Sequence, residues 1–298
     1  MEFKGENILE FNQRFPDNKA CLEYLAEIKW SAGFKCKKCG HTKFTIRARN
    51  QARDCNRCHH VESPTAATLF HRVRFGIRKA FGIVFEMSAT SKGLSSKQVA
   101  SRYGISRTTA WSFMHKVRTA MGSSKKHPMK GVVQVDEFVF GGKENLKQGR
   151  STDSKKKKIH GAVEITEKGK IKRVYFNKLK DFSSESLRVI FENHISKSAN
   201  ILTDKWTGYK PLLSDFNIEQ KYSNKGGSMK QMHTIIHQLK SWLRSVYSWI
   251  HEDHLEKYLD EFSFRINRSI YKQTIFHSLI SRMIKGKPIK YQQLIISS

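Results

Sequence analysis

Hydrophobic residues in the first part of the chain recur mainly at helical spacing. Residues 1–30 predict a short helical lead-in, and the apolar positions from Val73 to Ala89 recur every three or four residues, as they do in a helix. Between these segments, residues 43–49 alternate in the manner of a strand. The pattern therefore predicts a largely helical region with one small β element.

The pattern changes after a polar stretch at 122–130. Three segments rich in β-branched and aromatic residues follow in succession, which predicts an antiparallel meander, at 132–140, 159–165 and 171–176. A helix from Ser183 to about Ser196 comes next, and a short apolar strand occupies 200–204. This order of three strands, a helix and a strand predicts an α/β domain with a mixed sheet.

A helix-turn-helix pattern occupies residues 94–111. A helix that begins at a serine carries Ala100 at the packing position, Gly104 follows four residues later as the turn, and Ser106 can cap a second helix. Any helical hairpin with a glycine turn has a similar pattern. In a DNA-binding motif the second helix enters the major groove with its N-terminal side chains toward the base edges, here Arg107, Thr108 and Thr109.

The charge of the chain favours the DNA-binding interpretation. It carries 55 Lys and Arg against 26 Asp and Glu, a formal net charge of +29, while 38% hydrophobic residues are enough for a packed core. The positive charge must then lie mostly on the surface, where it attracts polyphosphates such as double-stranded DNA. No apolar run approaches the roughly 18 residues that a membrane span needs, so we expect a cytoplasmic protein without membrane contact.

Four cysteines form two CxxC pairs with fifteen residues between the pairs, at Cys36, Cys39, Cys55 and Cys58. Four thiolates at this spacing are what a tetrahedral structural Zn²⁺ site needs. A disulfide framework is typical of small secreted domains, whereas this chain has 298 residues and no recognisable signal peptide. His41, His59 and His60 can compete as ligands, yet four cysteines already fill the site. A fifth cysteine, Cys21, is expected to be a small buried hydrophobic residue.

Two carboxylates occupy strand positions where burial is costly. Asp136 lies inside one apolar strand and Asp204 at the end of another. On neighbouring strands the pair can share Mg²⁺ ions that support in-line attack on a phosphodiester. The residues alone leave simpler roles open, a turn or cap for Asp204 and a lysine partner for Asp136. Glu137 should point to the other face of its strand, so we do not expect it to be a ligand.

Several motifs occur in a fixed order, and together they resemble the IS1595 family of bacterial insertion-sequence transposases with its ISXO2-like domain. They are Val135-Asp-Glu-Phe-Val-Phe-Gly-Gly142, Thr203-Asp-Lys-Trp-Thr-Gly-Tyr209, His233-Thr234 followed by Lys240-Ser-Trp-Leu-Arg244, and the segment Tyr258–Arg268. The resemblance covers nearly the whole chain, including the cysteine pairs and the helix-turn-helix. It implies an RNase H-like catalytic fold and DNA strand transfer at transposon ends with Mg²⁺ or Mn²⁺. It also implies a nucleoid-associated bacterial protein that acts as a homo-oligomer on DNA.

By that resemblance Asp136 and Asp204 are the first two metal ligands of a DDE-type site. The family tends to carry Glu or Asn five residues after the His of the His-Thr motif, where this chain has Gln238, preceded by His237. Either side chain can bind a metal, and the preference of Mg²⁺ for oxygen favours Gln238. Downstream carboxylates rank lower as the third ligand: Glu252, Glu256, Asp260 and Glu261.

The segment after the His-Thr motif is predicted to be an amphipathic helix. Its basic residues share one face, which would meet the DNA backbone and bring a histidine near the metal for coordination or proton transfer. We call this set the basic stripe; it consists of His233, His237, Lys240 and Arg244. The opposite face is apolar and is expected to pack in the core.

We therefore expect an α+β chain of several domains. They are a zinc ribbon with its lead-in at 1–65, a helical region with the helix-turn-helix at 66–122, an RNase H-like transposase domain at 128–285, and a basic tail at 286–298. The missing third carboxylate keeps an alternative open, a catalytically impaired DNA-binding protein derived from a transposase. A zinc-dependent regulator that uses only residues 1–120 is a further alternative.

Overall fold

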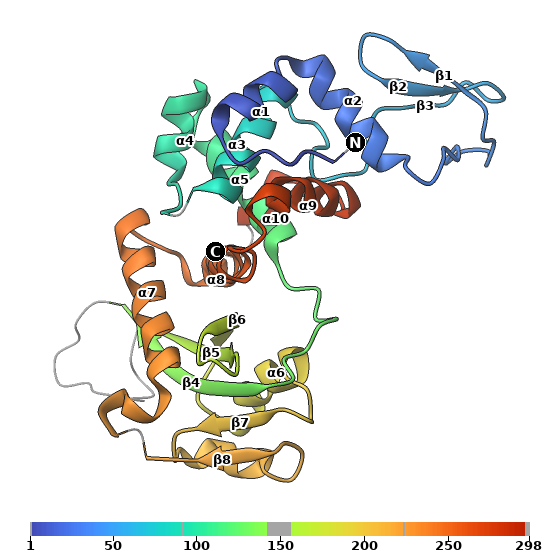
Figure 1. The fold of residues 1–298 in the computed structure, drawn as a ribbon. Coiled ribbons are helices and arrows are strands. Elements are labelled where there is room, and N and C mark those ends of the chain that lie inside the picture. The colour runs from blue at the N-terminus through green and yellow to red at the C-terminus, as the bar shows by residue number, and fades with distance from the viewer. Residues whose placement is uncertain (1, 91, 142–155, 223, 296–298) are drawn as a thin grey trace. The chain divides into compact units, whose positions relative to one another are not determined.

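The computed structural model describes residues 2–90, 92–141, 156–222 and 224–295 (Figure 1). They form two compact units. The first unit comprises Met1–Met121 together with Arg268–Ser298, and the second comprises Gly122–Asn267. No helix of the described segments is long and apolar enough to cross a membrane.

The first unit contains helices packed around phenylalanine rings. Its helices are α1 (Ile8–Arg14), α2 (Asn18–Lys29), α3 (Ile77–Ala89), α4 (Ser96–Tyr103), α5 (Arg107–Met121), α9 (Lys272–Lys285) and α10 (Tyr291–Ile295). The ring of Phe276 on α9 contacts the rings of Phe11 and Phe81. Cys21 is fully buried in this unit, as predicted. A C-terminal helix therefore completes the core that the N-terminal helices begin.

This packing corrects the predicted domain boundaries. We expected the catalytic domain to extend to residue 285, but α9 belongs to the first unit. Helical spacing predicted that α9 exists and could not show which core buries its apolar face. Residues 1–121 cluster in one unit, so the division near residue 65 stays a prediction. Residues 291–295 of the predicted tail are helical.

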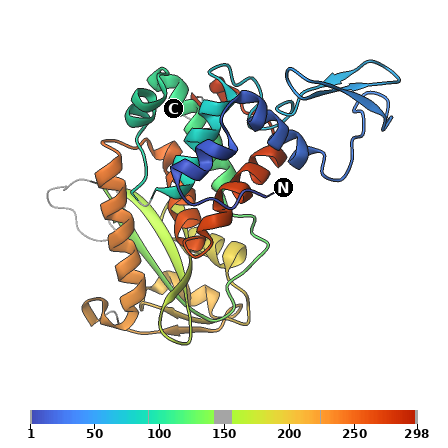
Figure 2. The same ribbon diagram turned by 45° about the horizontal axis from the view of Figure 1, so that its top comes forward.

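The four cysteines lie around a small antiparallel sheet of strands β1 (Phe44–Arg47), β2 (Ala52–Cys55) and β3 (Val61–Glu62) (Figure 2). Trp30, at the end of α2, and Phe34 pack beside the cysteines. The buried carboxylate of Glu62 forms an ion pair with Lys29 Nζ of α2 at 2.8 Å. The sheet is thus joined to α2 by apolar packing and by one buried ion pair.

The helical hairpin of α4 and α5 follows the predicted pattern closely. Ser95 caps α4 in a capping box with Gln98. Gly104 ends α4 in the left-handed conformation (φ 56°, ψ 52°), which glycine adopts without strain. Ser106 Oγ then accepts the backbone N–H of Thr109 at 3.1 Å, as an N-cap does. These contacts join two helices by a short turn.

A mixed five-stranded sheet forms the centre of the second unit, in the order β6-β5-β4-β7-β8. The strands are β4 (Val132–Phe140), β5 (Lys157–Ile165), β6 (Ile171–Leu179), β7 (Asn200–Thr203) and β8 (Ile218–Gln220). β4, β5 and β6 are antiparallel neighbours, while β7 pairs in parallel with β4 and β8 with β7. The predicted meander and mixed sheet are confirmed, and β8 is a strand that the sequence did not reveal.

Helices cover both faces of this sheet. Phe138 and Val163 belong to a core cluster with α7 (Lys230–Val246) and α8 (Leu255–Asn267), and α7 runs along the sheet in Figure 2. Val133 and Val135 belong to a second cluster with α6 (Ser184–His194) and η1 (Thr207–Leu212). Two further short 3-10 helices are η2 (Asn224–Met229) and η3 (Glu252–His254). Alternate residues of β4 therefore face different helices.

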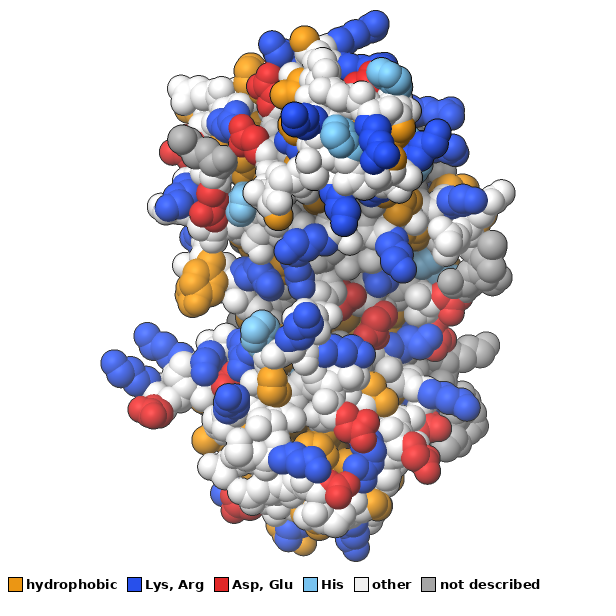
Figure 3. Space-filling model, turned by 90° about the vertical axis from the view of Figure 1, so that its right-hand side faces the viewer, with side chains coloured by type: hydrophobic (Ala, Val, Ile, Leu, Met, Phe, Trp, Pro, Cys, Tyr) orange, Lys and Arg blue, Asp and Glu red, His pale blue; other side chains and the backbone are white. Residues whose placement is uncertain are grey.

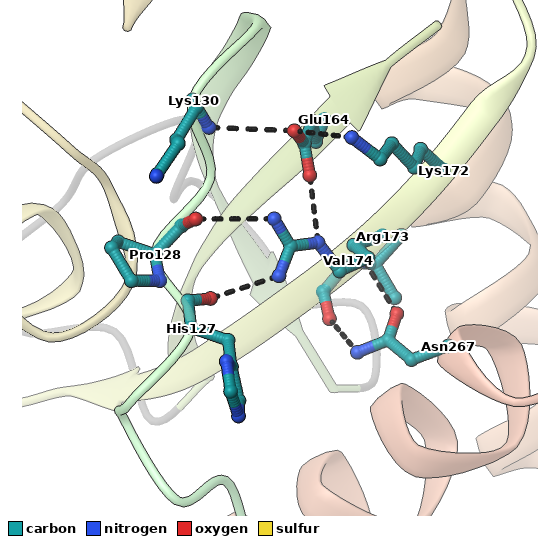
Figure 4. Close-up of polar contacts among 8 residues, drawn as sticks. All are labelled: His127, Pro128, Lys130, Glu164, Lys172, Arg173, Val174 and Asn267. Carbon is teal, nitrogen blue, oxygen red and sulfur yellow. Dashed lines mark hydrogen bonds and ion pairs between the residues drawn. The ribbon is translucent and has the colours of Figure 1, made fainter. Parts of the chain in front are cut away.

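A buried ion pair holds the start of the second unit against its sheet (Figure 4). Glu164 is only 1% exposed, and Arg173 Nε donates to its Oε2 at 2.7 Å. The guanidinium of Arg173 also donates to the carbonyl oxygens of His127 and Pro128, at 2.9 and 3.1 Å. Charge-assisted hydrogen bonds of this kind are stronger than neutral ones. They fix the segment that leads into β4.

Candidate functional site

The four cysteines of the two CxxC pairs converge on one point. Their sulfur atoms all lie within 4.8 Å of one another, and no disulfide forms among the described cysteines. Cys36 Sγ lies 3.6 Å from Cys58 Sγ, and Cys39 Sγ lies 3.5 Å from Cys55 Sγ. In a tetrahedron with Zn–S bonds of about 2.3 Å, the sulfurs are about 3.8 Å apart. The four thiols are therefore positioned to bind one zinc ion.

Backbone donors support the charged form of the Cys55 thiol. Burial acts to raise the pKa of Cys55, yet hydrogen bonds from the backbone N–H groups of Cys58 and Arg57 lower it to about 7. A thiolate is the form that binds zinc. Four sulfurs leave no open coordination position, so this geometry suits a structural ion.

Asp136 lies in the middle of β4, and Asp204 lies just past the end of its parallel neighbour β7. The last residue pair between β4 and β7 joins Gln134 to Leu202, so each aspartate lies two residues beyond it. One carboxylate oxygen from each of Asp136, Glu137 and Asp204 lies within 4.8 Å of the other two. The structure brings the predicted pair together and adds a third carboxylate. We call these three residues the carboxylate group.

Glu137, which we did not expect to be a metal ligand, nevertheless lies beside the two aspartates. It does lie on the side of η1, because the hydroxyl of Tyr209 donates a hydrogen bond to its Oε2. Its carboxylate nevertheless reaches the two aspartates, since β7 ends at Thr203 and its pairing with β4 stops before Glu137. Strand alternation predicted the direction of the Glu137 side chain correctly. It could not predict that the carboxylate reaches the aspartates where β7 no longer pairs with β4.

A buried chain of hydrogen bonds leads from Glu137 into the core. His160 Nε2 lies 3.2 Å from the hydroxyl oxygen of Tyr209, and both residues are fully buried. Burial lowers the pKa of His160 to about 3 and raises the pKa of Tyr209 well above its usual value. Tyr209 therefore keeps the proton that it donates to Glu137, while a neutral His160 donates to Tyr209. One sequence signal points to this hydrogen-bonded chain, because Tyr209 belongs to the same motif as Asp204.

The basic stripe of α7 borders the end of β4 at two points. His233 Nε2 lies 3.9 Å from Asp136 Oδ2, and Lys240 Nζ lies 4.9 Å from the ring centre of Phe138. Burial, and next the charge of Arg244, lower the pKa of Lys240, and the charge of Asp136 acts in the opposite direction. His233 and Lys240 of the basic stripe therefore lie on the side of α7 that faces β4. His233 is the member that approaches the carboxylate group.

The third ligand predicted on α7 is not found in the carboxylate group. His237 is exposed and lies outside that group. Gln238 is also exposed and sits roughly 130° around the helix axis from the middle of the basic stripe, so it does not share that edge. The role of either residue as a metal ligand stays a prediction.

The downstream carboxylates have structural partners away from β4. Glu256 accepts the backbone N–H of Lys178 on β6 at 2.7 Å, and Glu252 pairs with Lys178 Nζ at 3.3 Å. β5 separates β6 from β4 in the sheet. Glu261 is fully buried beside Arg265, at 2.7 Å, and Asp260 lies 3.8 Å from Lys257. These contacts hold α8 and its neighbours in place.

The side chains predicted to contact DNA lie at the start of α5. Arg107 and Thr108 are exposed, whereas Thr109 is half-buried and its hydroxyl accepts a hydrogen bond from Ser106 Oγ at 2.8 Å. Thr109 therefore contributes to the cap of the helix, and the other two residues face solvent. Gly142, the last residue of the motif that contains Asp136, lies outside the described residues.

Two protein-family models match the chain. The ISXO2-like transposase domain matches residues 128–267, and the transposase zinc-ribbon domain matches residues 16–61. No curated protein matches the chain. The first match ends at the last residue of the second unit and contains the carboxylate group. The second match contains all four zinc-site cysteines.

Proposed function

Because the chain belongs to the IS1595 family of transposases, we propose that it binds the terminal inverted repeats of an insertion sequence and catalyses metal-dependent cleavage and strand transfer of DNA. The observation that carries the catalytic part is the carboxylate group, which joins two residues of β4 to the residue just past the end of β7. The sheet order, with an antiparallel meander followed by parallel strands, supports an RNase H-like fold for the second unit.

The donor set of the carboxylate group fits Mg²⁺ or Mn²⁺. Carboxylate oxygens are the ligands that these hard cations prefer, and three of them lie close enough to share an ion. A bound ion would stabilise the attacking and leaving oxygens of a phosphodiester. Asp136 and Asp204 would hold it, Tyr209 would orient Glu137, and His233 would meet the substrate beside Asp136.

DNA recognition is assigned to the first unit. The exposed start of α5 presents Arg107 and Thr108 in the position that base-contacting residues occupy in helix-turn-helix proteins. The zinc ribbon adds a second basic element to the same unit. In the space-filling view of one face, Lys and Arg side chains are spread among fewer acidic ones, as expected for a protein that binds DNA (Figure 3).

Neutral variants of the carboxylate group test this proposal. Asp136→Asn and Asp204→Asn keep the shape of each side chain and remove its charge. We expect each to abolish strand transfer on DNA carrying the transposon ends, and to remove the thermal stabilisation that Mn²⁺ gives the wild type. Binding to the same DNA should persist, because the DNA contacts are assigned to the first unit.

Asp215→Asn is the matched control. Asp215 lies in the same unit, pairs with Arg188 at 2.5 Å and is not in the carboxylate group. Its replacement should leave strand transfer and the Mn²⁺ effect unchanged. Unchanged strand transfer in Asp136→Asn would refute the catalytic site. A wild type that binds the ends and shows neither strand transfer nor a Mn²⁺ effect would support the impaired, DNA-binding alternative.

A further inference from the structure

A cleft runs along α5 in the first unit, beyond the residues predicted to contact base edges. Two pockets of about 470 and about 510 Å³ share Arg72, Lys116 and Tyr291 in their linings, so they adjoin one another. We call the two together the α5 cleft. All of its lining residues belong to the first unit, and none of them is Asp or Glu.

One wall of the α5 cleft is a stripe along the helix itself. Thr108, Ser112 and Lys116 are spaced by four residues, so they lie on one face of α5. Each carries a side-chain hydrogen-bond donor, two hydroxyls and one ammonium. This wall begins at the exposed end of the helix and continues along it. A ligand that met Thr108 could therefore extend toward Lys116.

The facing wall is a basic segment that is firmly anchored. It contributes Arg72 and Arg74 to the α5 cleft. The preceding Phe70 is fully buried, and its ring contacts that of Phe113 on α5. Arg72 itself has φ 56°, a left-handed conformation that is uncommon for residues other than glycine and costs energy. The structure thus holds this arginine at the cleft despite a backbone penalty.

Lys116 is the central cation of the α5 cleft. It is half-buried, and burial lowers its pKa. No acidic side chain among the described residues forms an ion pair with it. Tyr291 of α10 lies at the same part of the cleft, with its ring 6.4 Å from that of Trp111. An anion bound here would meet a partly desolvated ammonium, where electrostatic attraction is stronger than in water.

We propose that the α5 cleft holds one sugar–phosphate strand of the bound DNA, with Lys116 and Arg72 donating to phosphate oxygens beside the end of α5. This inference rests on the proposed DNA binding and adds a backbone contact to it. Phosphate contacts fix the position of a protein on the duplex and are independent of sequence. Both walls of the α5 cleft carry hydrogen-bond donors, and no acidic residue lines it, as a contact with phosphate groups requires.

The salt dependence of DNA binding tests the proposal on the full chain. Lys116→Gln and Arg72→Gln should each weaken binding by the same factor on transposon-end DNA and on unrelated DNA. Each should also reduce the slope of log affinity against log salt by about 1, because one phosphate contact is lost. Arg107→Ala, at a predicted base contact, should instead reduce the preference for end DNA.

Two further variants keep the test decisive. Lys272→Gln is the matched control, because Lys272 begins α9 and lies about 20 Å along that helix from the end that leads to Pro288 and the cleft. It should leave the slope unchanged. Lys116→Arg preserves the charge and should restore the wild-type slope, which a purely structural role would not require. Thermal melts confirm that each variant is folded.

Phosphate-ethylation interference locates the contact on the DNA. Ethylation of one or two phosphates should impair binding of the wild type and have no further effect on Lys116→Gln. The proposal is overturned if Lys116→Gln matches Lys272→Gln in slope and interference pattern while the wild type binds DNA. If the wild type binds no DNA even at low salt, the proposed function fails together with the cleft.

Discussion

The two clusters that can hold metal ions are built in opposite ways. The zinc-site cysteines come from two turns within residues 36–58, and backbone hydrogen bonds within each turn already direct the sulfurs together. The carboxylate group joins Asp136 and Asp204 from separate strands, which the sheet alone brings side by side. A local cluster is visible in residue spacing, whereas a cluster made by topology needs the fold.

The two clusters also differ in what the metal must do for the protein. The ribbon has only three short strands and a small apolar cluster, so its fold is expected to depend on zinc. The second unit has two large apolar clusters on the faces of its sheet. Its fold should persist without metal, and a metal there would serve chemistry rather than stability.

Loss of one zinc ligand should give the largest effect. Cys55→Ser removes a buried thiolate, and structural zinc contributes about 10–16 kcal/mol in zinc-finger peptides at neutral pH. We expect zinc analysis to fall from about one ion per chain to none. Hydrogen exchange should show lost protection in β1, β2 and β3, with the second unit unchanged.

Cys21→Ala is the control for this variant. Cys21 is also buried but lies outside the cysteine cluster, so zinc should stay bound. If Cys55→Ser keeps one zinc ion and its strands stay protected, the ribbon does not depend on this ligand. The proposed difference between the two clusters would then be wrong.

The second unit should lose stability in acid and should keep it when metal is removed by a chelator. Hydrogen bonds from Arg173 and Lys172 outweigh burial and lower the pKa of Glu164 below its usual 4.5. A carboxyl with a depressed folded-state pKa stabilises the fold above its unfolded-state pKa, and this stabilisation is lost as pH falls through the folded-state pKa. The loss should therefore begin below about pH 4.5, while a chelator at neutral pH has no effect on this unit.

Glu164→Gln isolates that contribution. It should cost about 3 kcal/mol at neutral pH, because it leaves a largely buried guanidinium without its carboxylate. It should also flatten the fall in stability below about pH 4.5 in denaturant titrations. Glu219→Gln, at an exposed position of β8, is the control. Equal acid sensitivity of Glu164→Gln and wild type would contradict the assignment.

The sequence predicted β4, β5, β6 and β7 and their succession along the chain, and Asp136 and Asp204 as partners, because apolar periodicity and the motif order are local signals. It did not predict β8. It assigned α9 to the wrong unit, since the apolar face of a helix does not identify the core that buries it. It omitted Glu137 because strand alternation says nothing about where a neighbouring strand ends. The chain from His160 to Glu137 was likewise out of reach, because it joins residues from three separate elements.

Removal of the Tyr209 hydroxyl should give the smallest effect, and it tests whether the core orients the carboxylate group. In Tyr209→Phe the ring still fills the core, but Glu137 and His160 lose their shared partner. We expect a loss of about 1–3 kcal/mol of stability, because a buried carboxylate and a buried imidazole are left without that hydrogen bond. Affinity for Mn²⁺, measured by calorimetry, should fall about 10- to 100-fold, as it does when a partner of a metal ligand is removed.

Tyr222→Phe serves as the control, because Tyr222 is 75% exposed in the same unit and loses only a solvated hydroxyl. The two readouts separate two roles for Glu137. If Tyr209→Phe lowers stability and leaves Mn²⁺ affinity unchanged, Glu137 is a structural neighbour and the site consists of the two aspartates. If both fall together, the hydrogen-bonded chain from the core orients a metal ligand. The carboxylate group would then depend on the fold for its orientation as well as for its assembly.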